Sequence, residues 1–249
     1  MYGGIAIFTD GLHIAVKRCG RGKDLVMLHG YMSCKESFYN NIPAFSGNFC
    51  VTAPDFPGFG ASSPIPRGWS VGDYAAWLEK FMAASGIEGA YLLAHSFGAR
   101  VAIKFAAERP RLVKAMVITG GAGIVKPRSR AYMRKVRAYR FVKKFAPRYA
   151  ERAFGSEEYR SLVPVMRESY KKIVNEDLRA DAARVHCPVL LVYGSGDTVT
   201  PAAEEGLAFA AAMPRACLKI IGGGHFCFMQ NSEIFNAEAA AFLGGLRET

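Results

Sequence analysis

The sequence YLLAHSFGARVAIKFAAERP (residues 91–110) joins an apolar run to a long amphipathic segment, with a serine at the junction. The run is typical of a buried strand, and the segment after Ser96 has helical periodicity up to Pro110. Ala94 and Gly98 are small enough for a sharp strand-to-helix turn that exposes the serine hydroxyl. Because a serine that only caps the helix would fit the same place, a catalytic role requires partners elsewhere in the chain.

The rest of the chain alternates short apolar segments with helical patterns. Residues 4–22 are typical of two strands joined by a turn at Asp10-Gly11. Helical patterns cover residues 71–85, follow Ser96, and start again near Ala202 and Asn231. Further buried strands are indicated at residues 25–30, 50–56, 91–96, 115–120, 188–194 and 217–223. This alternation predicts an α/β fold, in which a mostly parallel central sheet carries helices on both faces.

Polar residues that follow the strands of such a sheet are candidates for a site, because sites form at the carboxyl ends of the strands. Asp197 follows one strand in LLVYGSGDTVTP (residues 190–201), and His225 follows the last strand. A serine hydroxyl needs a base to take its proton, and a carboxylate holds the imidazole base in the required tautomer. Asp197 could instead cap the helix after Pro201, in which case Asp55 is the next carboxylate to consider. His225 is the only histidine after Asp197.

These motifs together resemble the α/β-hydrolase family over nearly the whole chain, except for its middle. AHSFG (residues 94–98) is similar to the nucleophile motif G-x-S-x-G, with Ala94 in place of the first glycine. LHGYMSCKESF (residues 28–38) resembles the oxyanion loop, and DFPGFGASS (residues 55–63) resembles the loop after the next strand. The resemblance implies the catalytic residues Ser96, Asp197 and His225. It also implies an oxyanion hole formed by the backbone N–H groups of Tyr31 and Phe97, and no cofactor.

Residues 124–184 interrupt this pattern with helical sequence. In the family, this position holds a helical cap that covers the site and lines the substrate pocket. We therefore expect a core formed by residues 1–123 and 185–249, with residues 124–184 inserted as a cap or lid. Tyr132, Tyr139 and Tyr170 occur at helical spacings in this segment and are the candidate substrate-binding residues.

Positive charge is concentrated in the expected cap. Residues 124–184 hold 17 Lys/Arg and 7 Asp/Glu, and the whole chain has a formal net charge of +11. The stretch 126–148 contains ten basic residues and no acidic one. It is either a solvated helical face or a surface for an anionic substrate, an acyl-carrier protein or an anionic membrane. Nucleic acid is not expected as a partner, because no nucleic-acid-binding motif accompanies the charge.

The composition bears on membrane spans, export, disulfides and metal sites. The 249 residues, 51% of them hydrophobic, are enough for one α/β core, and no run of about 18 apolar residues predicts a transmembrane helix. The N-terminal sequence is unlike a signal peptide, so we expect a cytoplasmic protein. Without paired Cys/His spacing, the six cysteines predict free, buried thiols and no metal site. Asp55, His29 and His95 are expected to order loops, and the glycines of GGGHF (residues 222–226) to allow close backbone approach.

The sequence therefore predicts a serine hydrolase of carboxylic esters or related acyl compounds, acting on a small-molecule substrate that is anionic, carrier-bound or neither. Carbon–carbon bond hydrolases of ring-cleavage products and proline-type aminopeptidases have related caps and remain alternatives. A small-molecule receptor or signalling protein that keeps the triad is a further alternative from a different class. A haloalkane dehalogenase is disfavoured, because that branch has an aspartate at the position of Ser96.

Overall fold

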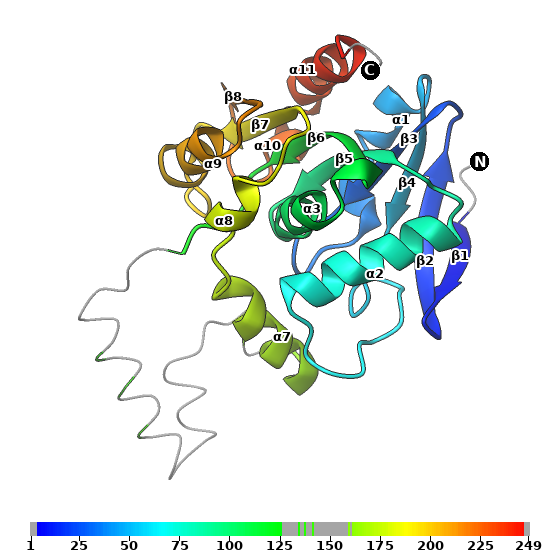
Figure 1. Ribbon diagram of the computed structural model, residues 1–249, viewed down its shortest axis with the longest axis vertical. Helices are drawn as coiled ribbons and strands as arrows, with labels where there is room; N and C mark the ends of the chain where they lie inside the picture. The colour runs from blue at the N-terminus through cyan, green and yellow to red at the C-terminus, as the bar shows by residue number, and fades with distance from the viewer. Residues whose placement is uncertain are drawn as a thin grey trace.

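A computed structural model of the chain describes residues 4–125, 134, 137, 141, 159 and 161–246. Within these residues, eight strands form one sheet in the spatial order β1-β2-β4-β3-β5-β6-β7-β8 (Figure 1). The strands are β1 Gly4–Thr9, β2 Leu12–Cys19, β3 Lys23–Leu28, β4 Phe49–Pro54, β5 Ala90–His95, β6 Val113–Thr119, β7 Val189–Gly194 and β8 Ala216–Ile221. Every strand expected from the sequence is present.

The sheet is parallel except at one edge. β1 pairs antiparallel with β2, and β2 pairs antiparallel with β4, whereas the other neighbouring strands are parallel. Asp10 and Gly11 form the β1–β2 turn with φ values of 50° and 75°, the left-handed conformation that a two-residue hairpin turn requires. The predicted α/β fold with a mostly parallel sheet is confirmed.

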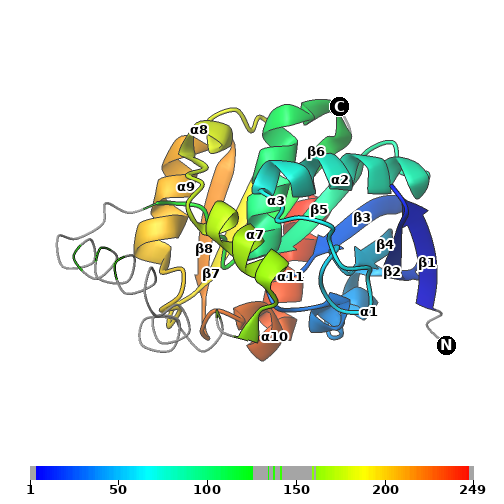
Figure 2. The same cartoon turned by 90° about the horizontal axis from the view of Figure 1, so that it is seen from below.

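Helices cover both faces of the sheet (Figures 1 and 2). One face carries α2 Val71–Ala84, α3 Phe97–Glu108, α8 Arg179–Ala182 and α9 Leu207–Ala212, and α7 Pro164–Val174 packs against the same core beyond the ends of the strands. The other carries α1 Ile42–Phe45, α10 Cys227–Gln230 and α11 Ser232–Gly244. Strand side chains alternate between the two cores: Val26 and Leu28 face the first, and Leu25 and Met27 face the second. The sheet is thus buried on both sides, which explains its continuous apolar strands.

The helix α2 begins where its sequence predicts. The Ser70 side chain accepts a hydrogen bond from Asp73 N–H, and the Asp73 side chain accepts one from Ser70 N–H. This reciprocal capping box satisfies two backbone donors that the first turn of a helix leaves without partners. Short helical turns also lie at Lys35–Phe38, at Pro110–Leu112 and at Ala202–Gly206. The turn at Lys35–Phe38 and helix α1 were not expected from the sequence.

Of the inserted segment, the structure describes α7, α8 and a few residues before them. Arg134 and Arg137 are exposed. Tyr132, Tyr139 and most of the basic stretch 126–148 lie outside the described residues. The prediction that residues 124–184 form a separate cap therefore stays a prediction.

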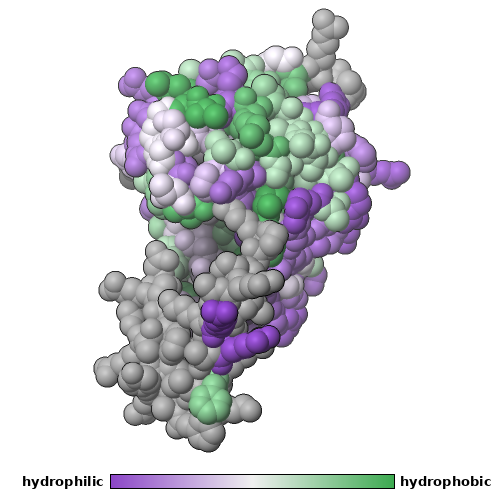
Figure 3. All heavy atoms as spheres, turned by 90° about the vertical axis from the view of Figure 1, so that its left-hand side faces the viewer, coloured by the Kyte–Doolittle hydropathy of each residue, from purple (hydrophilic) through white to green (hydrophobic). Residues whose placement is uncertain are grey.

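All six cysteines are free, but the expectation that they are buried is wrong for most of them. Only Cys227 is buried, and Cys217 is exposed because it lies on β8, whose alternate residues face solvent at the sheet edge. Ile220 on the same strand is 58% exposed. On this side of the molecule, Figure 3 shows hydrophobic patches interspersed with hydrophilic ones. None of the helices among the described residues is long and apolar enough to cross a membrane.

Candidate active site

Ser96 is the single residue between β5 and α3, and its backbone is strained. Its φ is 51° and its ψ is −105°, in a half of conformational space that residues with a Cβ rarely adopt. Although Ser96 occupies the N-cap position, its hydroxyl makes no capping hydrogen bond. The alternative that Ser96 is only a helix cap is therefore wrong, because its hydroxyl does not accept a hydrogen bond from the first turn of α3.

The chain around Ser96 explains why its neighbours are small. A Cβ added to Gly98 would lie 2.2 Å from the carbonyl oxygen of Leu28 at the end of β3. Ala94 is fully buried on β5. A larger residue at position 98 would push α3 away from the sheet, so the glycine is what allows the turn.

The loops after β7 and β8 approach each other backbone to backbone. Gly196 N–H donates to the carbonyl of Gly223 over 2.8 Å. A Cβ added to Gly194 would lie 2.2 Å from the carbonyl oxygen of Gly224. Gly194 therefore has to be a glycine, and Gly223 of the GGGHF sequence adopts a φ of 107° that favours glycine. The approach of the two loops brings His225 beside Asp197.

The three side chains that the sequence singled out form one hydrogen-bonded chain. His225 Nε2 lies 3.0 Å from Ser96 Oγ, and His225 Nδ1 lies 2.9 Å from Asp197 Oδ2. A carboxylate can only accept, so Nδ1 carries the proton and Nε2 is left to accept from the serine hydroxyl. The carboxylate is fully buried and the imidazole is 11% exposed. This is the arrangement in which an imidazole can deprotonate a serine.

Asp197 is held by its own loop. Its Oδ1 accepts hydrogen bonds from the N–H groups of Val199 and Thr200 over 2.8 and 2.9 Å. The Thr200 hydroxyl lies 2.8 Å from Oδ2. Burial alone would raise the pKa of Asp197, but these donors and His225 outweigh it and keep the pKa below its ordinary value. The donors precede the helical turn that starts at Ala202, so the carboxylate closes its loop and does not cap that helix.

The two backbone groups expected to form an oxyanion hole lie near Ser96. Phe97 begins α3, and Tyr31 follows β3; both line the cavity that contains Ser96 and His225. In the described part of the chain, neither N–H donates a hydrogen bond. The Tyr31 ring packs edge-on against Phe97 at 5.4 Å, and its hydroxyl donates to the carbonyl of Met166 in α7.

Ser96 opens into a cavity of about 480 Å³. Tyr170, a candidate substrate-binding residue, lines this cavity, with its ring centroid 5.4 Å from that of Tyr31. Tyr132 and Tyr139 lie outside the described residues. The rest of the wall is mostly apolar and includes Leu162, Ile173, Val174, Val199 and Phe226.

Two buried histidines hold the loops around the site, as expected. His29 donates through Nδ1 to the carbonyl of Gly30 and accepts the N–H of Phe56 at Nε2. His95 donates through Nε2 to the carbonyl of His225 over 3.0 Å. Burial lowers the pKa of His29 to about 4 and that of His95 to about 3. Both rings are therefore neutral near pH 7 and act as fixed hydrogen-bonding groups.

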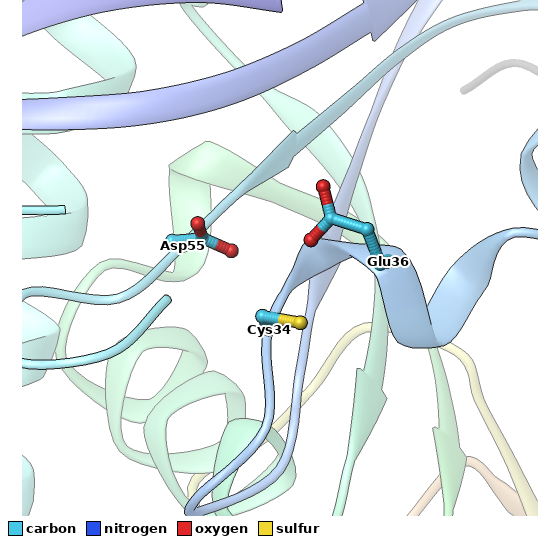
Figure 4. A group of neighbouring side chains, drawn as sticks. All are labelled: Cys34, Glu36 and Asp55. Carbon is cyan, nitrogen blue, oxygen red and sulfur yellow. The ribbon is translucent and has the colours of Figure 1, made fainter. Parts of the chain in front are cut away.

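Asp55 orders the loop after β4, as predicted. It accepts hydrogen bonds from the N–H groups of Lys35 and Ala61, over 2.7 and 2.9 Å. Its carboxylate lies with Cys34 and Glu36 in a group of metal-ligand types within 4.8 Å of one another (Figure 4). However, the Lys35 ammonium lies 2.9 Å from Asp55 and 3.0 Å from Glu36. A lysine ion pair thus accounts for this cluster.

Three polar residues of the site were missed from the sequence. Thr200 supports Asp197, and the buried side chains of Arg100 and Glu205 line the cavity. Arg100 did have a signal: it interrupts the apolar face of α3 one turn after Ser96. Glu205 and Thr200 had none, because polar residues after a strand are common in surface loops.

The sequence and the structure of the chain are similar to those of known proteins. A sequence model described as alpha/beta hydrolase fold matches residues 24–187. The chain is 27% identical to an acetyltransferase component of the acetoin cleaving system from Cupriavidus necator, over 95% of this chain and 68% of the relative. It is 26% identical to a pimeloyl-[acyl-carrier protein] methyl ester esterase from Aeromonas hydrophila, over 78% of this chain and 84% of the relative. A bacterial membrane phospholipase A has a similar structure, with a TM-score of 0.81 and 22% sequence identity. The match covers 100% of this chain and 87% of the phospholipase chain.

Proposed function

The chain belongs to the α/β-hydrolase fold family, and from that premise we propose that it is a serine hydrolase that cleaves carboxylic esters through an acyl-enzyme. The observation that carries the proposal is the continuous chain from Ser96 Oγ through His225 to Asp197, with separations of 3.0 and 2.9 Å. An ester is favoured as substrate because the Aeromonas relative is named as a methyl ester esterase.

The reaction follows from the roles of the groups. His225 Nε2 takes the proton of Ser96 as the hydroxyl attacks the ester carbonyl, and Asp197 stabilises the imidazolium. The carbonyl oxygen becomes an oxyanion between the N–H groups of Tyr31 and Phe97, each worth about 3 kcal/mol in such sites. His225 then protonates the departing alcohol. A water molecule, deprotonated by the same imidazole, releases the acid and restores Ser96.

We further propose that residues 124–184 act as a cap over this chemistry. Tyr170 and Ile173 of α7 line the cavity together with Ser96, which supports a role of the segment in substrate contact. A cavity closed by such a segment excludes water and strengthens the electrostatic interactions inside it.

Labelling with a fluorophosphonate tests the nucleophile. One adduct is expected, on the peptide that contains Ser96, and Ser96→Ala should remove both the adduct and the hydrolysis of p-nitrophenyl esters. An adduct on another residue, or full activity of Ser96→Ala, contradicts the proposal. Repeated turnover separates an enzyme from a receptor that keeps the triad, because a receptor would release about one equivalent of product per chain.

A further inference from the structure

Arg100 is a buried cation on the wall of the cavity. It lies one helical turn after Ser96 on α3, is 9% exposed, and lines the same cavity. Residues four apart lie on the same face of a helix, and helical side chains lean toward the N-terminus. Arg100 and Ser96 therefore lie on one face of α3 and line one cavity.

One nitrogen of the guanidinium is committed to the protein. Nη1 donates to the carbonyls of Ile173 and Glu176 at the carboxyl end of α7, over 3.0 and 3.1 Å. In the part of the chain that the structure describes, Nε and Nη2 have no hydrogen-bond acceptor. The Nε–Nη2 edge presents two parallel N–H groups, the geometry that matches both oxygens of a carboxylate.

The charge of Arg100 persists in this apolar wall. Burial lowers the pKa of Arg100, whereas Glu205, which lines the same cavity, acts in the opposite direction. An arginine stays protonated in proteins. The Glu205 carboxylate is 6% exposed and accepts the N–H of Ile124 over 3.0 Å. Burial outweighs this negative charge, so an acceptor on a ligand at the Nε–Nη2 edge would stabilise the guanidinium further.

We propose that Arg100 is a specificity-determining residue that binds a carboxylate carried by the substrate at some distance from the scissile carbonyl. The inference rests on the proposed function and names its substrate class: half-esters of short dicarboxylic acids, or acyl compounds with an equivalent terminal carboxylate. A planar monoanion suits the free Nε–Nη2 edge. A dianionic phosphate suits it less, because Glu205 places a negative charge on the same cavity.

Matched methyl esters test this preference. Methyl hexanoate and monomethyl adipate have acyl chains of equal length and differ in the terminal carboxylate, and half-esters from succinate to pimelate vary the reach. The protein should prefer one of these half-esters to its neutral counterpart. Arg100→Met should lower kcat/KM for that half-ester roughly 10- to 100-fold, mainly through KM, because a charge-assisted pair is lost. It should change the neutral ester little.

Two further variants sharpen the result. Arg100→Lys, which keeps the charge but not the planar edge, should restore part of the preference. Arg109→Met removes an exposed arginine at the end of the same helix and should leave both esters unaffected. If Arg100→Met lowers both esters alike, Arg100 only holds the end of α7 and the proposal is wrong.

Binding of adipate to the wild-type protein provides a readout that needs neither turnover nor a folded variant. Calorimetry should show that adipate binds, and that neutral adipamide binds with an affinity at least tenfold lower. Equal binding of the two, or binding of neither, overturns the role of Arg100. If Ser96 is labelled and neutral esters are hydrolysed, but half-esters are not preferred, this inference alone is overturned. Absence of both labelling and ester hydrolysis would overturn the proposed function instead.

Discussion

The loops after β4 and β7 each place a buried carboxylate beyond a strand end, yet the two carboxylates have different partners. Asp55, after β4, pairs with the Lys35 ammonium and accepts hydrogen bonds from the N–H groups of Lys35 and Ala61. Asp197, after β7, pairs with the His225 imidazole, which contacts Ser96. An ammonium has no lone pair with which to accept a proton, whereas an imidazole held in one tautomer can accept a proton at its other nitrogen. The partner, and not the position after a strand, separates the structural carboxylate from the one that we propose to be catalytic.

The largest expected difference between variants of Asp197 and variants of Asp55 is in activity. Asp197→Asn should lower kcat by about 10⁴-fold, because the amide no longer enforces the tautomer with a proton on Nδ1. The protein should still fold, since the amide fills the same space. Ester hydrolysis per folded molecule, with folding checked by circular dichroism, measures this. Near wild-type activity would mean that another carboxylate orients His225.

The next difference concerns stability. Asp55→Ala should lower the free energy of unfolding by about 3–5 kcal/mol, because it leaves the Lys35 ammonium partly buried without its main partner. Urea unfolding measures this loss. Lys35→Met in the Asp55→Ala background should recover part of the stability. Activity per folded molecule should fall far less than in Asp197→Asn; an equal fall would remove the distinction between the loops.

A third test uses the neutral histidines beside the loops, His29 next to Asp55 and His95 next to His225. Their pKa values, lowered from 6.5 to about 4 and about 3, mean that the unfolded chain binds protons below pH 6.5 that the folded chain does not. Stability should therefore fall as the pH drops from 6.5 toward 4, by about 1.4 kcal/mol per pH unit for each histidine. Urea unfolding at several pH values measures the slope.

His29→Asn separates the two histidines. It should make the slope shallower by about one proton, since the contribution of His29 is removed. An unchanged slope would show that His29 is already protonated in the folded protein at these pH values.

The smallest expected effect is at Thr200. Thr200→Val removes a hydroxyl 2.8 Å from Asp197 and should lower kcat about fivefold, the equivalent of one ordinary hydrogen bond. Thr52→Val on β4 is the matched control, because the buried Thr52 hydroxyl has no partner in the described part of the chain. Steady-state kinetics should show no change for the control. Equal losses in both variants would mean that Thr200 contributes only packing.

The sequence predicted the strands, the long helices and the residues around Ser96 because each leaves a local pattern. Gly98 and the glycines near His225 were informative for the same reason, since a missing side chain reports a close approach. The partners of Arg100 could not be predicted, because carbonyls 73 and 76 residues away leave no trace in local periodicity. The exposure of Cys217 was missed, because β8 lies at the sheet edge and an edge strand can have the same composition as a central one.

The backbone of Ser96 also bears on how this chain can change over generations. A glycine adopts a φ of 51° without the steric cost that a Cβ brings, about 1–2 kcal/mol. Ser96→Gly should therefore give a more stable but inactive protein. A lineage in which the reaction no longer mattered would drift toward glycine at this position, because selection for stability would act alone. The serine would persist only under continued selection for the hydroxyl that the proposed reaction uses, which would make this residue a marker for telling active descendants from inactive ones.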